Sequence, residues 1–370
     1  MKTTKILLAL VAGLFLMSGT AFAFHDGGVA HCDGCHSMHN TADNPRTGSA
    51  TSANLMKGSD ASSTCLNCHN GTGGYHVSST VGDNMKAGGD FFWVKPTSIY
   101  DTTTSHYTVP APSQRGHNVI AADFGLVQDD VLAQAPGGTY PANTLGCTSC
   151  HDPHGQKNGG TANGGAAIIA SGSYGGDSTL LPAGETYGNY RILNEDVAAA
   201  PVARANGSDG ASVDYGSGMS TWCAGCHTNF NTATNMHPVN VAVPVAYNAY
   251  VKTGDFTGDV ATAYDPLVPF ERGVTNGALL DETSTAGVST GTEVVMCLSC
   301  HRAHASAFAN SLRWDNKVAF MPESAILNES TTTLVANGAI PYYANGVAVD
   351  VVAKYGEYQR QLCNKCHVKD

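Results

Sequence analysis

The sequence predicts a mostly irregular chain with a few short α and 3₁₀ helices and very little β structure. Three observations support this prediction. The 370 residues include 42 Gly and only 13% of them are charged, long amphipathic helical stretches are hard to find, and all 12 cysteines fall into one short repeated motif. Such a chain lacks the patterned apolar sequence of an ordinary large core. Something other than protein must therefore supply much of its buried apolar surface.

The repeated motif is Cys-x-x-Cys-His, which occurs six times and leaves no cysteine over. Two intervening residues let one helical turn present both thiols to the two vinyl groups of a single haem, where they form thioethers, and the next His reaches the iron. The motifs therefore predict six covalently attached haem c groups, so that the haem chain forms the core. The predicted attachment cysteines and proximal histidines are Cys32, Cys35 and His36; Cys65, Cys68 and His69; Cys147, Cys150 and His151; Cys223, Cys226 and His227; Cys297, Cys300 and His301; Cys363, Cys366 and His367.

Three other uses of these cysteines explain the motif less well. Disulfides are common in secreted proteins with an even number of cysteines, but they do not explain a His after every second Cys. Zinc binds Cys-x-x-Cys pairs, yet three four-cysteine zinc sites would leave the six following histidines without a role. Thioredoxin-like redox chemistry normally uses one such motif in a βαβ setting.

Nine histidines remain for the opposite faces of the six irons, and bis-histidine ligation needs six of them. Three of the nine each follow a proximal His by three residues, at the first, third and fifth motifs. A His so close to its own motif seldom reaches the far face of the same haem. We therefore predict that each of the three ligates a different haem and ties neighbouring haems together. These three are His39, His154 and His304.

A second group of histidines lies in turn-rich stretches or near the predicted mature N-terminus. By contrast, His31 and His106 are interpreted as structural or exposed. Methionine is the alternative axial ligand and would raise the reduction potential, but Met38 and Met236 lie beside better histidine candidates. The predicted ligands of this second group are His76, His117 and His237, with His25 as a further candidate.

Motifs with and without the extra His alternate along the chain, which predicts one domain over residues 24–370 built from three two-haem units. The segments between motifs read mainly as turns and loops, and 158–176 and 206–218 are rich in Gly, Ser and Asn. Three short runs are strand-like, although packing against haem explains them equally well. These runs are 91–94, 239–245 and 347–352.

Residues 1–23 are predicted to form a cleaved signal peptide, because a basic start and an apolar run of about a dozen residues precede Ala21-Phe-Ala23. The run is shorter than the roughly 20 residues of a spanning helix. No other segment comes near that length, so we expect a secreted protein without a transmembrane segment. Removing Lys2 and Lys5 from the 19 basic residues leaves 17 against 30 acidic ones, a net charge of −13. This acidity excludes a general nucleic-acid-binding role and disfavours anionic lipid as a partner.

Several stretches resemble the OmcS-type hexahaem cytochromes, which are extracellular cytochromes of metal-reducing bacteria that polymerise into conductive filaments. The resemblance spans the predicted mature chain, is strongest around the motifs, and is weak in the loops at 156–215 and 307–355. The similar stretches are Phe24-His-Asp-Gly-Gly-Val-Ala30, Cys32-Asp-Gly-Cys-His-Ser-Met-His-Asn40, Gly89-Asp-Phe-Phe-Trp-Val-Lys95, Ala135-Pro-Gly-Gly-Thr-Tyr-Pro-Ala142, Cys147-Thr-Ser-Cys-His-Asp-Pro-His-Gly155, Cys297-Leu-Ser-Cys-His-Arg-Ala-His-Ala-Ser306 and Leu362-Cys-Asn-Lys-Cys-His-Val-Lys-Asp370.

The resemblance implies bis-histidine ligation, haems in alternating parallel and perpendicular pairs, and very little regular secondary structure. It also implies a bond between subunits: the family histidine that matches His39 ligates the fifth haem of the adjacent subunit, the haem attached here at Cys297 and Cys300. His31 and His106 match no family histidine. Seven histidines match for six distal positions, and His25 is the one we expect to be in excess. The seven are His25, His39, His76, His117, His154, His237 and His304.

Three functions compete for this sequence. An electron conduit, filamentous by the resemblance, needs only six-coordinate irons and no general base. Its partners would be copies of itself, other multihaem cytochromes and extracellular acceptors such as Fe(III) oxides. A nitrite or hydroxylamine reductase needs an open axial site, and no motif has Lys in place of the proximal His. A monomeric periplasmic shuttle needs the same haems as a filament subunit. We therefore predict an extracellular electron-transfer protein that is not an enzyme, with the periplasm as the alternative location.

Overall fold

A computed structural model describes part of the chain, and the structural statements below refer to that part. Regular structure is sparse within it, as the composition predicts. The residues described are 32–37, 55–71, 76–80, 86–96, 111–151, 153, 201–205, 213–231, 238–250, 258–317, 319–320, 343–344, 347–348, 355, 358 and 360–366.

Every α-helix in the described ranges contains at least one cysteine of a Cys-x-x-Cys-His motif. In α2, α4 and α6 the helix is a single turn that runs from one motif cysteine to the other. Residues three apart lie on the same face of a helix, so one turn is enough to point both thiols in one direction. The helices are α2 (Cys32–Cys35), α3 (Ala61–His69), α4 (Cys147–Cys150), α5 (Met219–Cys223), α6 (Cys297–Cys300) and α9 (Arg360–Cys363).

Short 3₁₀ helices supply most of the remaining regular structure. They suit a chain rich in Gly and Asn, because one such turn needs few residues. Their bounds are η3 (Phe91–Val94), η4 (Pro112–Gln114), η5 (Ala122–Phe124), η6 (Ala142–Thr144), η9 (Thr228–Asn231), η10 (Val245–Tyr250), η11 (Val260–Thr262), η12 (Gly277–Leu279) and η13 (Ala309–Ser311).

The two described sheets are small antiparallel pairs. Strand β1 (Val202–Ala205) pairs with β2 (Val213–Ser217), and β3 (Tyr343–Ala344) pairs with β4 (Val347–Ala348). The interpretation of 206–218 as loop is therefore wrong for β2. The composition suggested a loop because Gly and Asp have low strand propensity. Burial and pairing with β1 stabilise the strand instead.

The three strand-like runs have different outcomes. The run at 347–352 contains β4, whereas 239–245 has one isolated bridge, between Ala242 and Val294. The run at 91–94 is the 3₁₀ helix η3, so a strand there is wrong. The physical reason is a cap: Asp90 accepts hydrogen bonds from the backbone N–H groups of Phe92 (2.9 Å) and Ser79 (2.9 Å), and this turns the chain.

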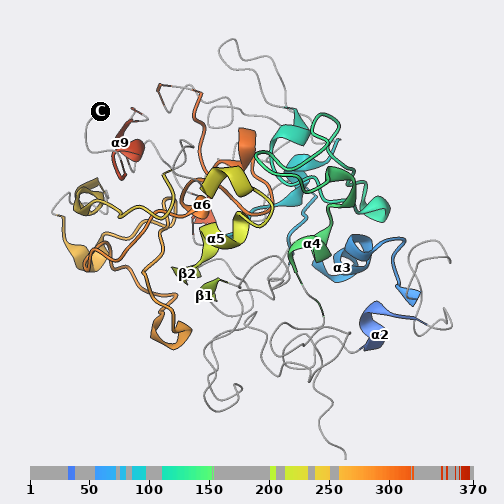
Figure 1. Cartoon of the computed structure of the whole chain (residues 1–370), viewed down its shortest axis with the longest axis horizontal. Helices are drawn as coiled ribbons and strands as arrows, with labels where there is room; N and C mark the ends of the chain where they lie inside the picture. The colour runs from blue at the N-terminus through green and yellow to red at the C-terminus, as the bar shows by residue number, and fades with distance from the viewer. Residues whose placement is uncertain are drawn as a thin grey trace, which may run out of the picture.

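The helices follow one another across the long axis of the molecule in chain order, from α2 to α9 (Figure 1). The pairs α3–α4 and α5–α6 lie side by side at its centre, and the β1–β2 pair lies beside α5. A large apolar cluster includes Leu66 of α3 and the four residues of η3, all of them buried. The protein thus has an apolar core of its own, which the composition did not predict. No helix in the described part is both long enough and apolar enough to serve as a transmembrane span.

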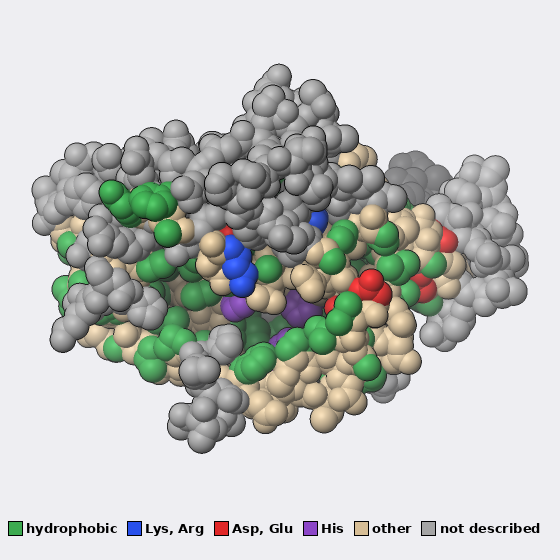
Figure 2. Space-filling model, turned by 90° about the horizontal axis from the view of Figure 1, so that it is seen from above, with side chains coloured by type: hydrophobic (Ala, Val, Ile, Leu, Met, Phe, Trp, Pro, Cys, Tyr) green, Lys and Arg blue, Asp and Glu red, His purple; other side chains and the backbone are tan. Residues whose placement is uncertain are grey.

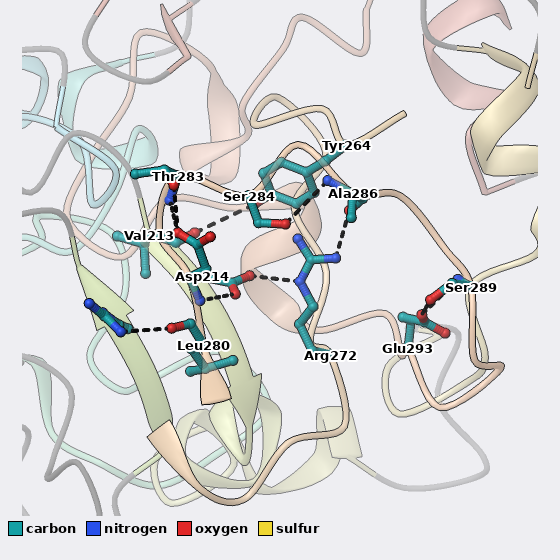
Figure 3. Close-up of polar contacts among 12 residues, drawn as sticks. Val213, Asp214, Tyr264, Arg272, Leu280, Thr283, Ser284, Ala286, Ser289 and Glu293 are labelled. Atoms are coloured by element: carbon teal, nitrogen blue, oxygen red, sulfur yellow. Dashed lines mark hydrogen bonds and ion pairs between the residues drawn. The ribbon is translucent and has the colours of Figure 1, made fainter. Parts of the chain in front are cut away.

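Buried charges hold the segment 264–293 against β2 (Figure 3). Arg272 donates from Nε to Asp214 Oδ1 (2.8 Å) and from Nη1 to the Ala286 carbonyl (2.6 Å). Its guanidinium carbon also lies 5.1 Å from the centre of the Tyr264 ring. Burial raises the pKa of Asp214, and the Arg272 charge opposes that rise. The pair ties strand β2 to a loop that leads directly into α6.

Glu293 accepts backbone hydrogen bonds in the segment before α6, and its ionisation should make the stability of the fold depend on acid pH (Figure 3). Its Oε1 accepts the N–H groups of Ser289 (2.8 Å) and Thr290 (3.0 Å). Although burial opposes ionisation, these amides lower the pKa of Glu293 to about 2. A lowered pKa means that the carboxylate stabilises the fold above its unfolded pKa of about 4.3, and that this contribution is lost as the pH falls through about 2.

We expect Glu293→Gln to lower the free energy of unfolding by about 1 kcal/mol at pH 7, since a charge-assisted hydrogen bond becomes a neutral one. Denaturant unfolding of the haem-loaded protein measures this, and the difference from wild type should shrink below about pH 4. The exposed Asp130→Asn is the matched control, expected within about 0.5 kcal/mol of wild type. A difference that stays constant from pH 7 to pH 3 would contradict the assigned role.

Candidate functional site

The second and third motifs meet where α3 packs against α4. The Cys65 thiol hydrogen-bonds to the Cys147 sulfur, which raises the pKa of Cys65 and lowers that of Cys147. Ser62, one turn before Cys65, accepts the backbone N–H of Cys147 at its Oγ (3.0 Å). This serine thus satisfies an N–H group at the start of α4 and fixes the distance between the two motifs.

The fourth and fifth motifs repeat this arrangement between α5 and α6. The Cys223 thiol hydrogen-bonds to the Cys297 sulfur, and this bond lowers the pKa of Cys297 to about 7. Ser220, one turn before Cys223, accepts the Cys297 N–H at Oγ (3.1 Å). Glu271 adds a contact from outside the pair, because its Oε1 accepts the Met219 N–H at the start of α5 (2.6 Å).

Weaker electrostatic contacts join the remaining motifs into a series. Cys35 lies close enough to Cys65 to contribute to its raised pKa, after the hydrogen bond to Cys147 and burial, which connects the first motif to the second. Burial, and then the nearby Cys226, raise the pKa of Cys150 to about 12, which connects the third motif to the fourth. Burial and then Cys366 likewise raise the pKa of Cys300 to about 12, which connects the fifth to the sixth. The six motifs therefore follow one another in space in their order along the chain, as the helices in Figure 1 do.

Two pairs of imidazole rings from distant segments face each other. The ring centres of His117 and His227 are 5.9 Å apart at an interplanar angle of 50°. Those of His151 and His304 are 6.3 Å apart at 56°. A metal held at about 2 Å by one nitrogen of each ring would separate the ring centres by about 6 Å. Each pair combines one predicted proximal and one predicted distal histidine, and His304 lies beside the proximal histidine of the third motif rather than that of its own.

Backbone carbonyls set the tautomer of two of these histidines and of His301. Nδ1 of His117 lies 2.6 Å from the Ala303 oxygen and Nδ1 of His227 lies 2.8 Å from the Pro136 oxygen. His301 makes the same contact with Asn310, at 2.7 Å. A carbonyl can only accept, so Nδ1 carries the proton and Nε2 keeps its lone pair for a metal. Burial, followed by the neighbouring His227, lowers the pKa of His117, which favours the neutral ligating form.

Aromatic rings and close glycine contacts hold the facing imidazoles. Phe91 of η3 stacks on His304 at 4.7 Å, and Phe230 stacks on His227 at 6.0 Å. A Cβ at position 88 would lie only 3.1 Å from the His304 ring, so the absence of a side chain at Gly88 avoids a steric clash with that ring. On the face that Figure 2 shows, histidine side chains lie in a recess bordered by hydrophobic side chains.

These observations fit haem c better than the other uses of cysteine. The described cysteines, from Cys35 to Cys366, are free thiols, so the described part contains no disulfide. No three His, Cys, Asp or Glu side chains of that part converge as a metal-chelating group, so it builds no four-cysteine zinc site. Paired thiols on one helical turn, followed by a histidine, instead match the needs of thioether attachment and axial ligation.

Some predicted site residues lie outside the described part, and other functional residues were not predicted. The three residues that position the motifs are Ser62, Ser220 and Glu271. The two serines could have been identified from the sequence, because both lie three residues before the first cysteine of an even-numbered motif. Glu271 could not, since it lies far from α5 in the chain. The predicted ligands outside the described residues are His25, His39, His154, His237 and His367, and the signal peptide at 1–23 lies outside them as well.

Known proteins resemble this chain in sequence and in fold. No protein-family model matches the chain. It is 36% identical over 438 aligned residues to C-type cytochrome OmcS of Geobacter sulfurreducens, with all of both chains covered. A cryo-EM structure of OmcS nanowires from the same organism matches with a TM-score of 0.71 and 35% identity, covering 94% of this chain and 100% of that one. An Outer Membrane Cytochrome S filament matches with a TM-score of 0.66 and 34% identity over the same shares. With this identity along its whole length, the chain belongs to the OmcS family of c-type cytochromes.

Proposed function

We propose that this protein carries electrons over long distances through six covalently bound haem c groups, as the repeating subunit of an extracellular filament. The observation that carries the proposal is the continuous series of motifs. Cysteines of successive motifs lie close enough to affect one another from Cys35 through to Cys366. Each haem, when bound, supplies a one-electron couple. The polypeptide therefore has to hold six such groups in a fixed order and at short spacing.

The ligand assignments proposed here follow the two facing imidazole pairs. His117 would share an iron with His227, and His304 with His151, since their spacing suits two axial nitrogens. The other distal positions remain predictions from the sequence, as does the division of residues 24–370 into three two-haem units. The proposed proximal ligands are His36, His69, His151, His227, His301 and His367, and the proposed distal ligands are His39, His76, His117, His154, His237 and His304, with His25 as a further candidate.

Electron transfer without catalysis follows from this ligation. A nitrite or hydroxylamine reductase needs one axial position that a substrate can occupy. If the facing imidazoles ligate as proposed, the haems of the third and fourth motifs would have no such position. The chain's own contribution is then to exclude water, orient the imidazoles and set potentials through burial, hydrogen bonds and charge.

Assembly and location are proposed from the relatives. Both solved structures that match are described as nanowires or a filament, which supports a homopolymer in which His39 reaches the fifth haem of the adjacent subunit. Secretion through a signal peptide at 1–23 would deliver the subunit to the outside of the cell. We propose other multihaem cytochromes and extracellular acceptors such as Fe(III) oxides as electron partners.

Mass spectrometry and electron microscopy of the secreted protein test the proposal together. We expect a polypeptide beginning at Phe24 that carries six added haem masses, and long filaments in the same preparation. Cys223→Ser combined with Cys226→Ser should remove one haem mass, because the thioethers of the fourth motif cannot form. A secreted chain without added haem mass, or one with six haems that never assembles, would refute the conduit or the filament, respectively.

A further inference from the structure

One serine side chain joins the second motif to the third, and another joins the fourth to the fifth. The Oγ of Ser62 accepts the backbone N–H of Cys147 (3.0 Å), and that of Ser220 accepts the N–H of Cys297 (3.1 Å). Each serine is the second residue of its helix, α3 or α5, and each is buried. The same contact is thus built twice, at the same register, between an even-numbered motif and the next odd-numbered one.

A serine at this position is not a requirement of haem attachment. The residue three before the first cysteine is Val29, Thr144, Val294 and Arg360 in the other four motifs. Those motifs have the same Cys-x-x-Cys-His sequence and are predicted to attach haem in the same way. The two serines therefore serve the contact between neighbouring motifs rather than the attachment chemistry of their own motif.

The serine bond is compatible with haem attachment, whereas the bond between the two thiols is not. The Cys65 thiol hydrogen-bonds to the Cys147 sulfur, but a thioether sulfur has no proton to donate. The bond to Ser62 uses the backbone N–H of Cys147, which thioether formation leaves unchanged. The serine therefore provides a link between the second and third motifs that the haem-loaded protein keeps.

Gly146, directly before Cys147, shows how closely Ser62 approaches the third motif. A Cβ at position 146 would lie 2.8 Å from the Ser62 Oγ, which is the only described atom beyond the adjacent residues that it would meet within 4 Å. The backbone of Gly146 is extended, with φ −148° and ψ 178°, a conformation open to any residue. Glycine here therefore gives room to the serine hydroxyl rather than freedom to the backbone.

We propose that Ser62 and Ser220 are positioning residues for electron transfer, whose hydroxyls fix the separation and mutual orientation of the second and third haems and of the fourth and fifth. Each hydroxyl holds together two helices whose cysteines attach neighbouring haems. Placing cofactors relative to one another is the protein's share of such chemistry, and electron transfer slows as haems move apart. The inference rests on the proposed haem attachment, which the haem mass of each variant tests separately.

Circular dichroism of the secreted haem-loaded protein measures this arrangement, because the Soret bands of neighbouring haems couple according to their distance and angle. Ser62→Ala should keep six added haem masses and lose part of the coupled Soret signal. Ser220→Ala should do the same at the other junction, and the double variant should show the sum of both losses, since the two sites share no partner. Filaments of either variant should conduct severalfold less than wild type, because the slowest step limits a series of transfers.

Ser63→Ala is the matched control for Ser62→Ala. Ser63 is the next residue of the same helix and is equally buried. Its hydroxyl donates to Asp60 (2.8 Å) and accepts the Asp123 N–H (3.2 Å), so its printed bonds lead away from the third motif. The substitution should lower stability to a similar degree and leave the Soret signal as in wild type.

Gly146→Ala disturbs the same contact without removing the serine. Its Cβ should displace the Ser62 hydroxyl and change the Soret signal as Ser62→Ala does. In the Ser62→Ala background it should have little further effect, because the atom that the Cβ would meet is gone. Two effects that simply add would show that Gly146 and Ser62 act independently and would contradict the proposed contact.

Three further outcomes would overturn the inference while leaving the proposed function in place. Unchanged Soret signals in both serine variants would mean that the hydroxyls do not set the haem arrangement. An equal change in Ser63→Ala would assign the effect to a general loosening of α3. A Ser62→Ala chain with five added haem masses would make Ser62 a residue needed for attachment. A wild-type chain without haem would instead refute the proposed function itself.

Discussion

His39→Ala should leave six haems attached to each chain and abolish the filaments. The reason is that thioether attachment depends on the motif cysteines, whereas His39 is expected to supply the axial ligand for the fifth haem of the next subunit. Losing it would remove a coordinate bond at every junction and leave one iron with an open axial position. Electron microscopy of the secreted protein, with haem mass measured on the same sample, checks both halves of this prediction.

His31→Ala is the matched control for that experiment. His31 lies in the same N-terminal stretch, but it is neither predicted to ligate nor matched in the family, so its variant should polymerise like wild type. Long filaments in the His39→Ala sample would contradict the proposed bond between His39 and the fifth haem of the adjacent subunit. If neither variant forms filaments, assembly depends on the N-terminal stretch as a whole rather than on one ligand.

His117→Ala should convert one haem of the six from low spin to high spin. His117 faces His227 at 5.9 Å, so its removal takes away one of two axial nitrogens while the attachment at Cys223 and Cys226 stays intact. Electron paramagnetic resonance of the oxidised protein should show a high-spin ferric signal equal to one haem per chain, and the wild-type spectrum should lack it. Added imidazole should return the signal to low spin, because it can fill the space that the side chain leaves.

Two further variants give this prediction its controls. His304→Ala should have the same effect through the other facing pair, at the haem of His151. His106→Ala should stay entirely low spin, because His106 is not predicted to be a ligand. A low-spin spectrum in the His117→Ala protein would show that another side chain ligates that iron and would overturn the assignment.

Local structure around the motifs could be predicted from the sequence because the relevant contacts span only a few residues. Each described α-helix contains a motif cysteine, as expected from the need to point two thiols that are three residues apart in one direction. The short strand β2 could not be predicted, because its Gly- and Asp-containing sequence has weak strand propensity and pairs with residues on the other side of a loop. Glu271 was missed for the same reason, since its hydrogen bond to Met219 joins two separate segments.

The sequence by itself determined the covalent chemistry, because a thiol, a second thiol one turn later and an adjacent imidazole form a complete attachment site within five residues. It also determined that histidine is available in sufficient number for both faces of every iron. Only the tertiary structure decided which imidazoles face each other, in what order the motifs follow, and that the hydroxyls of Ser62 and Ser220 reach the motif after their own. Those contacts join residues far apart in the chain, and their geometry depends on how irregular loops pack, which no local pattern of residues encodes.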